Sequence, residues 1–240
     1  MTRAIALWLL ALTGCASDPV PHELTFTFTN VSTPGDLVDS SGGQHDIAFA
    51  PAILIVHSED FTLFTVGEAA PWDGLEAITE DGNNVGLINE LRDVESVRMV
   101  RPFASTDADY NELPLEPGQS VSQSVEVSAG DRISWVSMYG QSNDVFVGTP
   151  PGGIPAFDDR EPLTGDVTAQ LALYDGGTEV NQEPGVGADQ APRQSGQDVG
   201  EDEDGVVTQI DGTDAMGFSY PAVGDMLTLT VAAVELVEDE

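Results

Sequence analysis

The chain has 240 residues, and its 42 acidic residues against 7 basic ones give it a formal net charge of −35 at neutral pH. Every basic residue is an arginine, and a charge this negative disfavours nucleic acids and anionic lipid surfaces as partners. The single cysteine excludes an internal disulfide, so an apolar core or a metal ion must hold the fold together.

The N-terminal segment predicts export and a lipid anchor. Arg3 precedes an apolar run over residues 4–12, which is followed by Thr13, Gly14 and Cys15. The run is far shorter than the roughly 20 residues that a membrane-spanning helix needs. Because the segment before Cys15 looks like a lipoprotein processing box, we predict that residues 1–14 are a lipoprotein signal peptide and that Cys15 carries the lipid. An ordinary cleaved signal with an unmodified Cys15 is the alternative.

Cleavage after residue 14 would remove one arginine and no acid, so the mature chain would carry six arginines, 42 acids and a net charge of −36. We expect it at the cell envelope, anchored by the lipid on Cys15 in the outer membrane or at the cell surface and facing away from the cytoplasm. Residues 15–22 are predicted to be a polar tether, residues 23–234 one domain and residues 235–240 an acidic tail.

Alternating hydrophobicity predicts strands along most of the domain. In residues 24–29, Leu24, Phe26 and Phe28 share one face and three threonines share the other, which is typical of a half-buried strand with Phe26 and Phe28 inside. The same alternation occurs in residues 121–127, 167–174 and 226–234.

Two other segments, residues 52–56 and 133–138, are more uniformly apolar and predict central strands buried on both sides, with Trp135 in the core. Residues 72–80 and 85–91 predict two short helices, separated by a turn at residues 81–84. The regions rich in glycine and proline, residues 149–155 and 183–205, predict loops. Together these patterns predict an all-β fold, an antiparallel β-sandwich with long loops and one or two short helices.

Catalytic motifs are missing from the sequence. The nearest match to a nucleophile elbow, at residues 217–221, lacks the second glycine. His22, His45 and His57 are not spaced as metal ligands, and His57 is expected to be a strand-end residue with structural hydrogen bonds. A glycosidase-like carboxylate pair stays open as an alternative, although 42 acids provide such pairs by chance.

Calcium matches the remaining polar motifs, because this hard cation binds carboxylate and carbonyl oxygens from loops. Asp144 is expected directly after a strand, and Asp175 is expected to end another. The glycines at 176 and 177 permit a tight reversal in which Asp175 and Glu179 face the same point. Taken singly, Asp144 and Asp175 are each more typical of turn-capping residues. The acidic residues 201–205 lack the spacing of a helix-loop-helix calcium site and predict a solvated loop.

Several segments resemble the N-terminal domain of the spondin family in order and spacing. They are residues 50–61, 74–82, 142–148, 173–179 and 205–210. The resemblance covers residues 23–234 and implies a β-sandwich in which Asp144, Asp175 and Glu179 hold one Ca²⁺. Animal members have aspartate at the position of Glu179, and they carry disulfides and thrombospondin-type repeats that this chain lacks, so their partners do not transfer.

Three functions are open at this point. The first is a non-enzymatic, Ca²⁺-binding adhesion or ligand-binding module at the cell envelope, with an extracellular protein or glycan as its ligand and no nucleic acid as a partner. The second is an envelope hydrolase, which a deep, aromatic-lined cleft around a carboxylate pair would favour. The third is a structural protein whose acids form only a solvated surface.

Overall fold

The computed structural model describes residues 20–108 and 111–236. The predicted signal peptide, Cys15, most of the tether and residues 237–240 of the predicted tail lie outside the described residues. Strands account for 37% of the structure and helices for 11%, in several antiparallel sheets, so the all-β prediction is confirmed. No helix among the described residues has the length and apolar character needed to cross a membrane.

The smaller main sheet has four strands, and β1 lies inside it, paired along its length with β17 on one side and β8 on the other. Phe28 of β1 is in register with Leu229 and Val121. In order across the sheet, the strands are β14 (Gly165–Asp166), β17 (Leu227–Glu235), β1 (His22–Asn30) and β8 (Ser120–Val127).

The larger main sheet has seven strands, with β4 and β9 paired near its centre and every residue of β4 buried. In order across the sheet, the strands are β16 (Thr208–Ile210), β15 (Ala172–Asp175), β10 (Val145–Gly148), β9 (Arg132–Met138), β4 (Ala52–His57) and β5 (Val97–Phe103), and β11 (Ile154–Pro155) also pairs with β9. The prediction of central, doubly buried strands at residues 52–56 and 133–138 is confirmed.

In the described part of the chain, three two-stranded ribbons lie outside the main sheets. They are β2 (Leu37–Val38) with β3 (Gln44–His45), β6 (Ser105–Thr106) with β7 (Glu112–Leu113), and β12 (Phe157–Asp158) with β13 (Glu161–Pro162).

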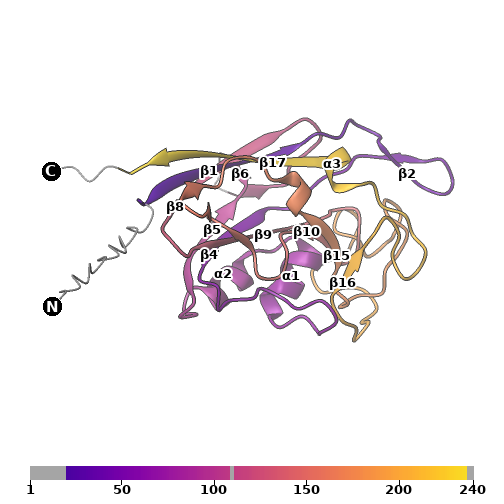
Figure 1. Cartoon of the computed structure of the whole chain (residues 1–240). Coiled ribbons are helices and arrows are strands. Elements are labelled where there is room, and N and C mark those ends of the chain that lie inside the picture. Colours follow the sequence, from indigo (N-terminus) through magenta and orange to yellow (C-terminus); the bar gives the residue numbers. More distant parts are fainter. Residues whose placement is uncertain (1–19, 109–110, 237–240) are drawn as a thin grey trace, which may run out of the picture.

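The two main sheets face each other across one hydrophobic core (Figure 1). Phe28 of the smaller sheet contacts Trp135 of the larger one edge-to-face, with ring centroids 4.8 Å apart, and Phe49 packs against Phe28 at 5.4 Å. Phe26, Phe28 and Trp135 have no exposed area, as the sequence predicted. The threonines of β1 are half-buried on the opposite face, where Thr27 Oγ1 lies 2.9 Å from Ser122 Oγ.

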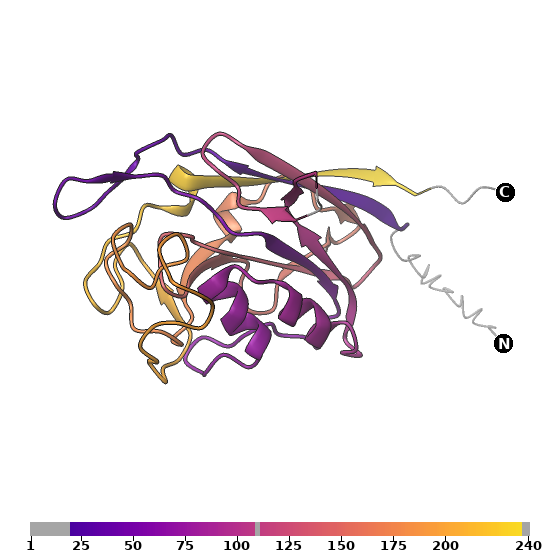
Figure 2. The ribbon, with the colours of Figure 1, turned by 180° about the vertical axis from the view of Figure 1, so that it is seen from behind.

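Helices α1 (Asp73–Asp81) and α2 (Val85–Leu91) cover the outer face of the larger sheet (Figure 2). Their apolar residues form a second cluster with side chains of β4, β9, β10 and β15. Gly82 ends α1 with a left-handed backbone, φ 67°, which confirms the predicted break between the helices. Two further short helical turns are η1 (Thr168–Gln170) and α3 (Val223–Met226).

Two local predictions were wrong. Residues 168–170, expected in a strand, form the turn η1, because Asp166 Oδ1 accepts a hydrogen bond from the Thr168 N–H (2.8 Å) and starts a turn there. Val167 and Leu171 are buried on either side of this turn, Ala169 and Gln170 are exposed, and β15 begins only at Ala172. Asp144, expected directly after a strand, instead lies directly before β10.

Candidate metal centre

Three loops meet at one end of the larger sheet. They are residues 139–144 between β9 and β10, residues 176–181 after β15, and residues 198–205 before β16. Because β10 and β15 are antiparallel neighbours with Val145 opposite Asp175, the first two loops leave the sheet side by side. The third loop runs back along the second, where the N–H groups of Glu203 and Gly205 donate to the carbonyls of Thr178 (2.8 Å) and Gly177 (2.7 Å).

Gly177 permits this close approach. Its φ is +69°, and a Cβ atom at this position would lie 2.5 Å from the backbone nitrogen of Val206. Any side chain would therefore push the third loop away from the second. The reversal predicted from the glycine pair is present, and it positions the acidic third loop as well as the residues that follow β15.

Asp144 is the most deeply buried acid of the region, with no exposed area. Its Oδ2 atom accepts hydrogen bonds from the N–H groups of Thr178 (2.8 Å) and Glu179 (3.2 Å) and from the Thr178 hydroxyl (3.1 Å). Its Oδ1 atom is buried and has no hydrogen-bond partner among the residues that the structure describes. A buried carboxylate oxygen without a donor is costly unless a cation or a proton satisfies it.

Asp175 lies beside Asp144 and is 5% exposed. Its Oδ1 accepts from the Gly177 N–H (2.9 Å), and its Oδ2 accepts from Asn181 Nδ2 (2.7 Å). The amide oxygen of Asn181, on the same carbon as that donor, is also buried without a partner. An orphaned amide oxygen therefore accompanies the orphaned carboxylate oxygen of Asp144.

The third acid of the group is Glu203, which the sequence had left in a solvated loop. One carboxylate oxygen from each of Asp144, Asp175 and Glu203 lies within 4.8 Å of the others, and we call these residues the inner cluster. Glu179, the third predicted ligand, points elsewhere: its Oε2 accepts from Asn143 Nδ2 (3.2 Å), and its carboxylate packs against Gly200. The structure thus brings together two of the three predicted ligands and adds Glu203.

Burial and mutual repulsion raise the proton affinity of these acids. Burial, and then the charge of Asp175, raises the pKa of Asp144 to about 7. Burial also raises the pKa of Asp175, and burial together with the charges of Asp175 and Asp214 raises that of Glu203. The pKa of Glu179 is raised to about 7, mainly by burial. A cation among these groups would favour their ionised forms.

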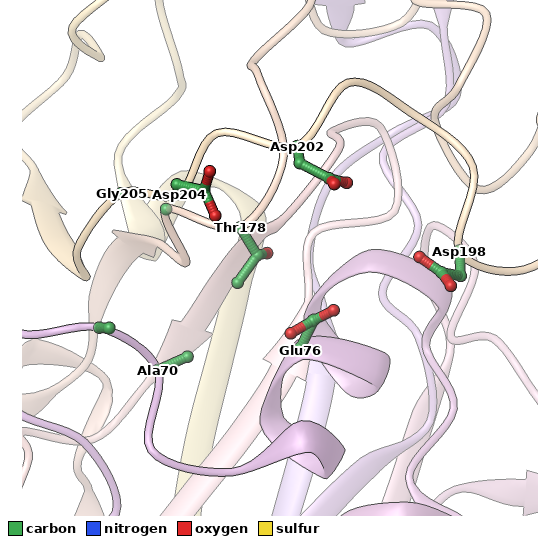
Figure 3. A pocket seen from close by; sticks show the side chains of 9 residues that line it. Ala70, Glu76, Thr178, Asp198, Asp202, Asp204 and Gly205 are labelled. Atoms are coloured by element: carbon green, nitrogen blue, oxygen red, sulfur yellow. The ribbon is translucent and has the colours of Figure 1, made fainter.

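A pocket of about 390 Å³ lies next to the inner cluster and is lined by acids and small residues without a base (Figure 3). Glu76 of α1 faces Asp198, while Asp202 and Asp204 project from the same loop above it. Glu80, one turn further along α1, is 5% exposed, and burial raises its pKa to about 8. Single oxygens of Glu76, Glu80 and Asp198 lie within 4.8 Å of one another, and we call these residues the outer cluster.

The histidines are not part of either cluster. His57 is fully buried, with Nδ1 2.8 Å from the Ser58 carbonyl and Nε2 2.9 Å from Ser134 Oγ, which confirms the predicted structural role. Burial lowers its pKa. His45 Nε2 lies 2.7 Å from Asp39 Oδ2 at the base of the β2–β3 ribbon.

Sequence reasoning missed Glu203 and Glu80. For Glu203 the available signal was a glycine on each side of the contact, Gly177 and Gly205, which suits close backbone approach. For Glu80, the available signal was its position in a predicted helix whose apolar face contains Leu75 and Ile78.

No protein-family model matches this chain, and a comparison with curated proteins gives no match. The resemblance to the spondin family therefore stays a prediction from the motifs around Asp144 and Asp175.

Proposed function

We propose that this chain is a non-enzymatic calcium-binding module of the spondin type, displayed at the cell envelope, where it binds an extracellular protein or glycan. The observation that carries the calcium proposal is the buried, unpartnered Oδ1 of Asp144 within a group of three carboxylates. Asp144, Asp175 and Glu203 would hold the ion, and Asn181, whose amide nitrogen donates to Asp175, has a buried amide oxygen without a partner among the described residues. This donor set contains only oxygen, as calcium prefers.

The choice of calcium over magnesium follows from size and ligand number. Calcium accepts about 6–8 oxygens at roughly 2.3–2.6 Å, whereas magnesium demands an octahedron at about 2.0–2.1 Å and keeps most of its water. Calcium also accepts ligands supplied by flexible loops, and the three carboxylates come from two loops and the end of β15. The bound charge would offset the repulsion among the carboxylates and order the three loops that supply them.

The arrangement of the molecule supports display at the envelope. β1 begins at the end of the molecule opposite to the loops that carry the acids (Figure 1). A chain tethered through a lipid on Cys15 would therefore present the acidic loops away from the membrane. Replacing Cys15 by alanine is expected to move the protein from the membrane fraction to soluble extracts, and unchanged membrane association would contradict the anchor.

The pocket beside the cluster supports binding rather than hydrolysis. Its lining contains alanines, glycines, a threonine and acids, whereas a glycan hydrolase would be favoured by aromatic residues around its carboxylate pair.

Calcium binding is tested by thermal unfolding at matched ionic strength in Ca²⁺ and in Mg²⁺. A specific site stabilises the fold by about 2.7 kcal/mol when the free ion exceeds the dissociation constant about a hundredfold, and extracellular sites reach this range at millimolar Ca²⁺. We expect a rise in Tm that is selective for Ca²⁺ and that largely disappears in Asp175→Asn. Asp158→Asn, on the remote ribbon β12–β13, is the matched control for loss of one charge. Equal responses to both ions in all three proteins would leave only a solvated acidic surface.

A further inference from the structure

The larger sheet ends at β5, and the outer edge of this strand is open. β5 pairs with β4, and no other strand of the described residues pairs with it. In the part of the chain that the structure describes, residues 98–102 make no backbone hydrogen bond to a loop or to the other main sheet. Because a strand directs backbone groups toward both of its edges, β5 has unpaired N–H and C=O groups on the side away from β4. Pro102, which has no N–H, is typical of such an edge strand.

A pocket of about 340 Å³ lies at this edge. Three of the seven arginines of the chain line it, and no acid of the described residues is among its lining residues. The chain has 42 acids, so a pocket with arginines and no acid runs against its composition. The residues that line the pocket are Ile88 and Arg92 from α2 and the segment after it, and Val97, Arg98, Met99, Val100 and Arg101 of β5.

Two of the three arginines are available to a ligand. Arg98 Nη2 lies 2.6 Å from Asp131 Oδ2 and also donates to the Glu126 carbonyl of β8, so the protein itself holds this side chain. Arg92 and Arg101 are exposed, and neither has an ion pair or a side-chain hydrogen bond within residues 20–108 and 111–236. An arginine offers five N–H donors in a planar fork that fits a carboxylate.

From this geometry we infer that β5 is a docking strand for an extended, acidic peptide segment of a partner protein, which adds to the edge of the larger sheet. The backbone of the peptide pairs with β5, and its carboxylates pair with Arg92 and Arg101.

The two faces of β5 suit an added strand whose side chains alternate. Val100 and Ile88 pack against the cluster under the helices, whereas Met99 packs against the core between the sheets. Arg101 alternates with Val100 and therefore shares the face of Met99, while Arg92 follows α2 on the other face. An added strand thus meets apolar surface and one arginine on each of its faces.

The docking strand is independent of calcium and goes beyond the proposed function. β5 and the strands β15 and β16, next to the inner cluster, are at opposite edges of the larger sheet. The net negative charge of the chain opposes an acidic ligand at long range, but screening limits this repulsion to about 8 Å at physiological salt. Close contacts with the two arginines therefore decide the binding.

The test is fluorescence anisotropy of a labelled peptide of alternating Glu and Val residues, titrated with the full chain in chelator. We expect binding that is weakened about tenfold in Arg92→Gln/Arg101→Gln, and weakened about tenfold when Gln replaces Glu in the peptide. Arg101→Gln alone should weaken binding, whereas its matched control Arg160→Gln, in the remote β12–β13 turn, should not. Wild-type affinity in the double variant would overturn the inference.

Methylated peptides test strand addition separately from charge. Two peptides carry N-methyl groups on alternate backbone nitrogens, each along one of the two edges of the strand. We expect one of them to lose binding and the other to keep it, because only one edge of the peptide faces β5. Equal binding of both would overturn the added strand. If the unmodified peptide does not bind the wild type, the arginines and Pro102 only protect the edge from aggregation, and the inference is wrong. All of these titrations are made without Ca²⁺, so failure of the calcium proposal does not alter them.

Discussion

The apolar core between the sheets and the two acidic clusters at the end of the larger sheet differ in what holds them together. In the core, Phe28, Phe49 and Trp135 are brought together by their own burial and ring contacts. In the clusters, carboxylates that repel one another are held close by backbone hydrogen bonds between neighbouring loops, such as that from Glu203 to Thr178. The core is therefore stabilised by its own burial, whereas the charges of the loops repel one another and oppose the contacts that hold the loops together.

The largest expected effect is in the core. Phe28→Ala removes a fully buried ring that contacts Trp135 at 4.8 Å, and we expect it to lower the free energy of unfolding by about 3–5 kcal/mol. Because the core does not need the ion, urea denaturation should show the same loss in Ca²⁺ and in chelator. A loss seen in only one of these conditions would mean that the stability of the core depends on the charge of the loops.

A smaller effect is expected from pH, and only in the metal-free protein. The pKa values of Glu80, Asp144 and Glu179 are raised to about 8, 7 and 7, above the ordinary values of 4.5 for Glu and 3.8 for Asp. Between the ordinary and the raised values the folded chain holds more protons than the unfolded chain, so stability falls as pH rises through this range. In chelator we expect a loss on the order of 2 kcal/mol between about pH 5 and pH 8.

Calcium and one variant sharpen this measurement. Saturating Ca²⁺ should flatten the fall in Tm with pH, because the ion favours the ionised carboxylates. Glu80→Gln should make the fall shallower in chelator, since it removes the acid with the most raised pKa. The exposed-acid variant Glu95→Gln is the control. If Tm instead rises with pH over this range in chelator, repulsion among the ionised carboxylates does not destabilise the fold, and the prediction is wrong.

The smallest effect is expected on the outer face of the smaller sheet. Thr27 Oγ1 lies 2.9 Å from Ser122 Oγ across the strand pair. Replacing Thr27 by alanine should cost about 0.2–1 kcal/mol, the usual value of one cross-strand pair, and Thr27→Ser should recover part of it. The response to Ca²⁺ should match that of the wild type, and an altered response would show that the two regions are coupled through β1.

The elements of the core were predictable because each depends on neighbours in sequence. The alternation in residues 24–29 assigned Phe26 and Phe28 to the inner face, and the structure buries both. The uniformly apolar residues 52–56 lie in the central strand β4, and α2 has the predicted bounds Val85–Leu91. The exception is η1, where a hydrogen bond from the Thr168 backbone N–H to the Asp166 carboxylate outweighs a weak alternating pattern.

The sequence by itself determined the faces of β1, the helices α1 and α2 and the turn glycines, and the resemblance to the spondin family predicted that Asp144 and Asp175 share a site. Only the tertiary structure decided that Glu203 lies close to them, that Glu179 turns toward Asn143 and Gly200, and that Glu80 lies close to Glu76 and Asp198. The physical reason is that a strand or helix follows from a period of a few residues. The position of a loop carboxylate depends instead on hydrogen bonds between segments far apart in the chain, here residues 177–180 and 201–205.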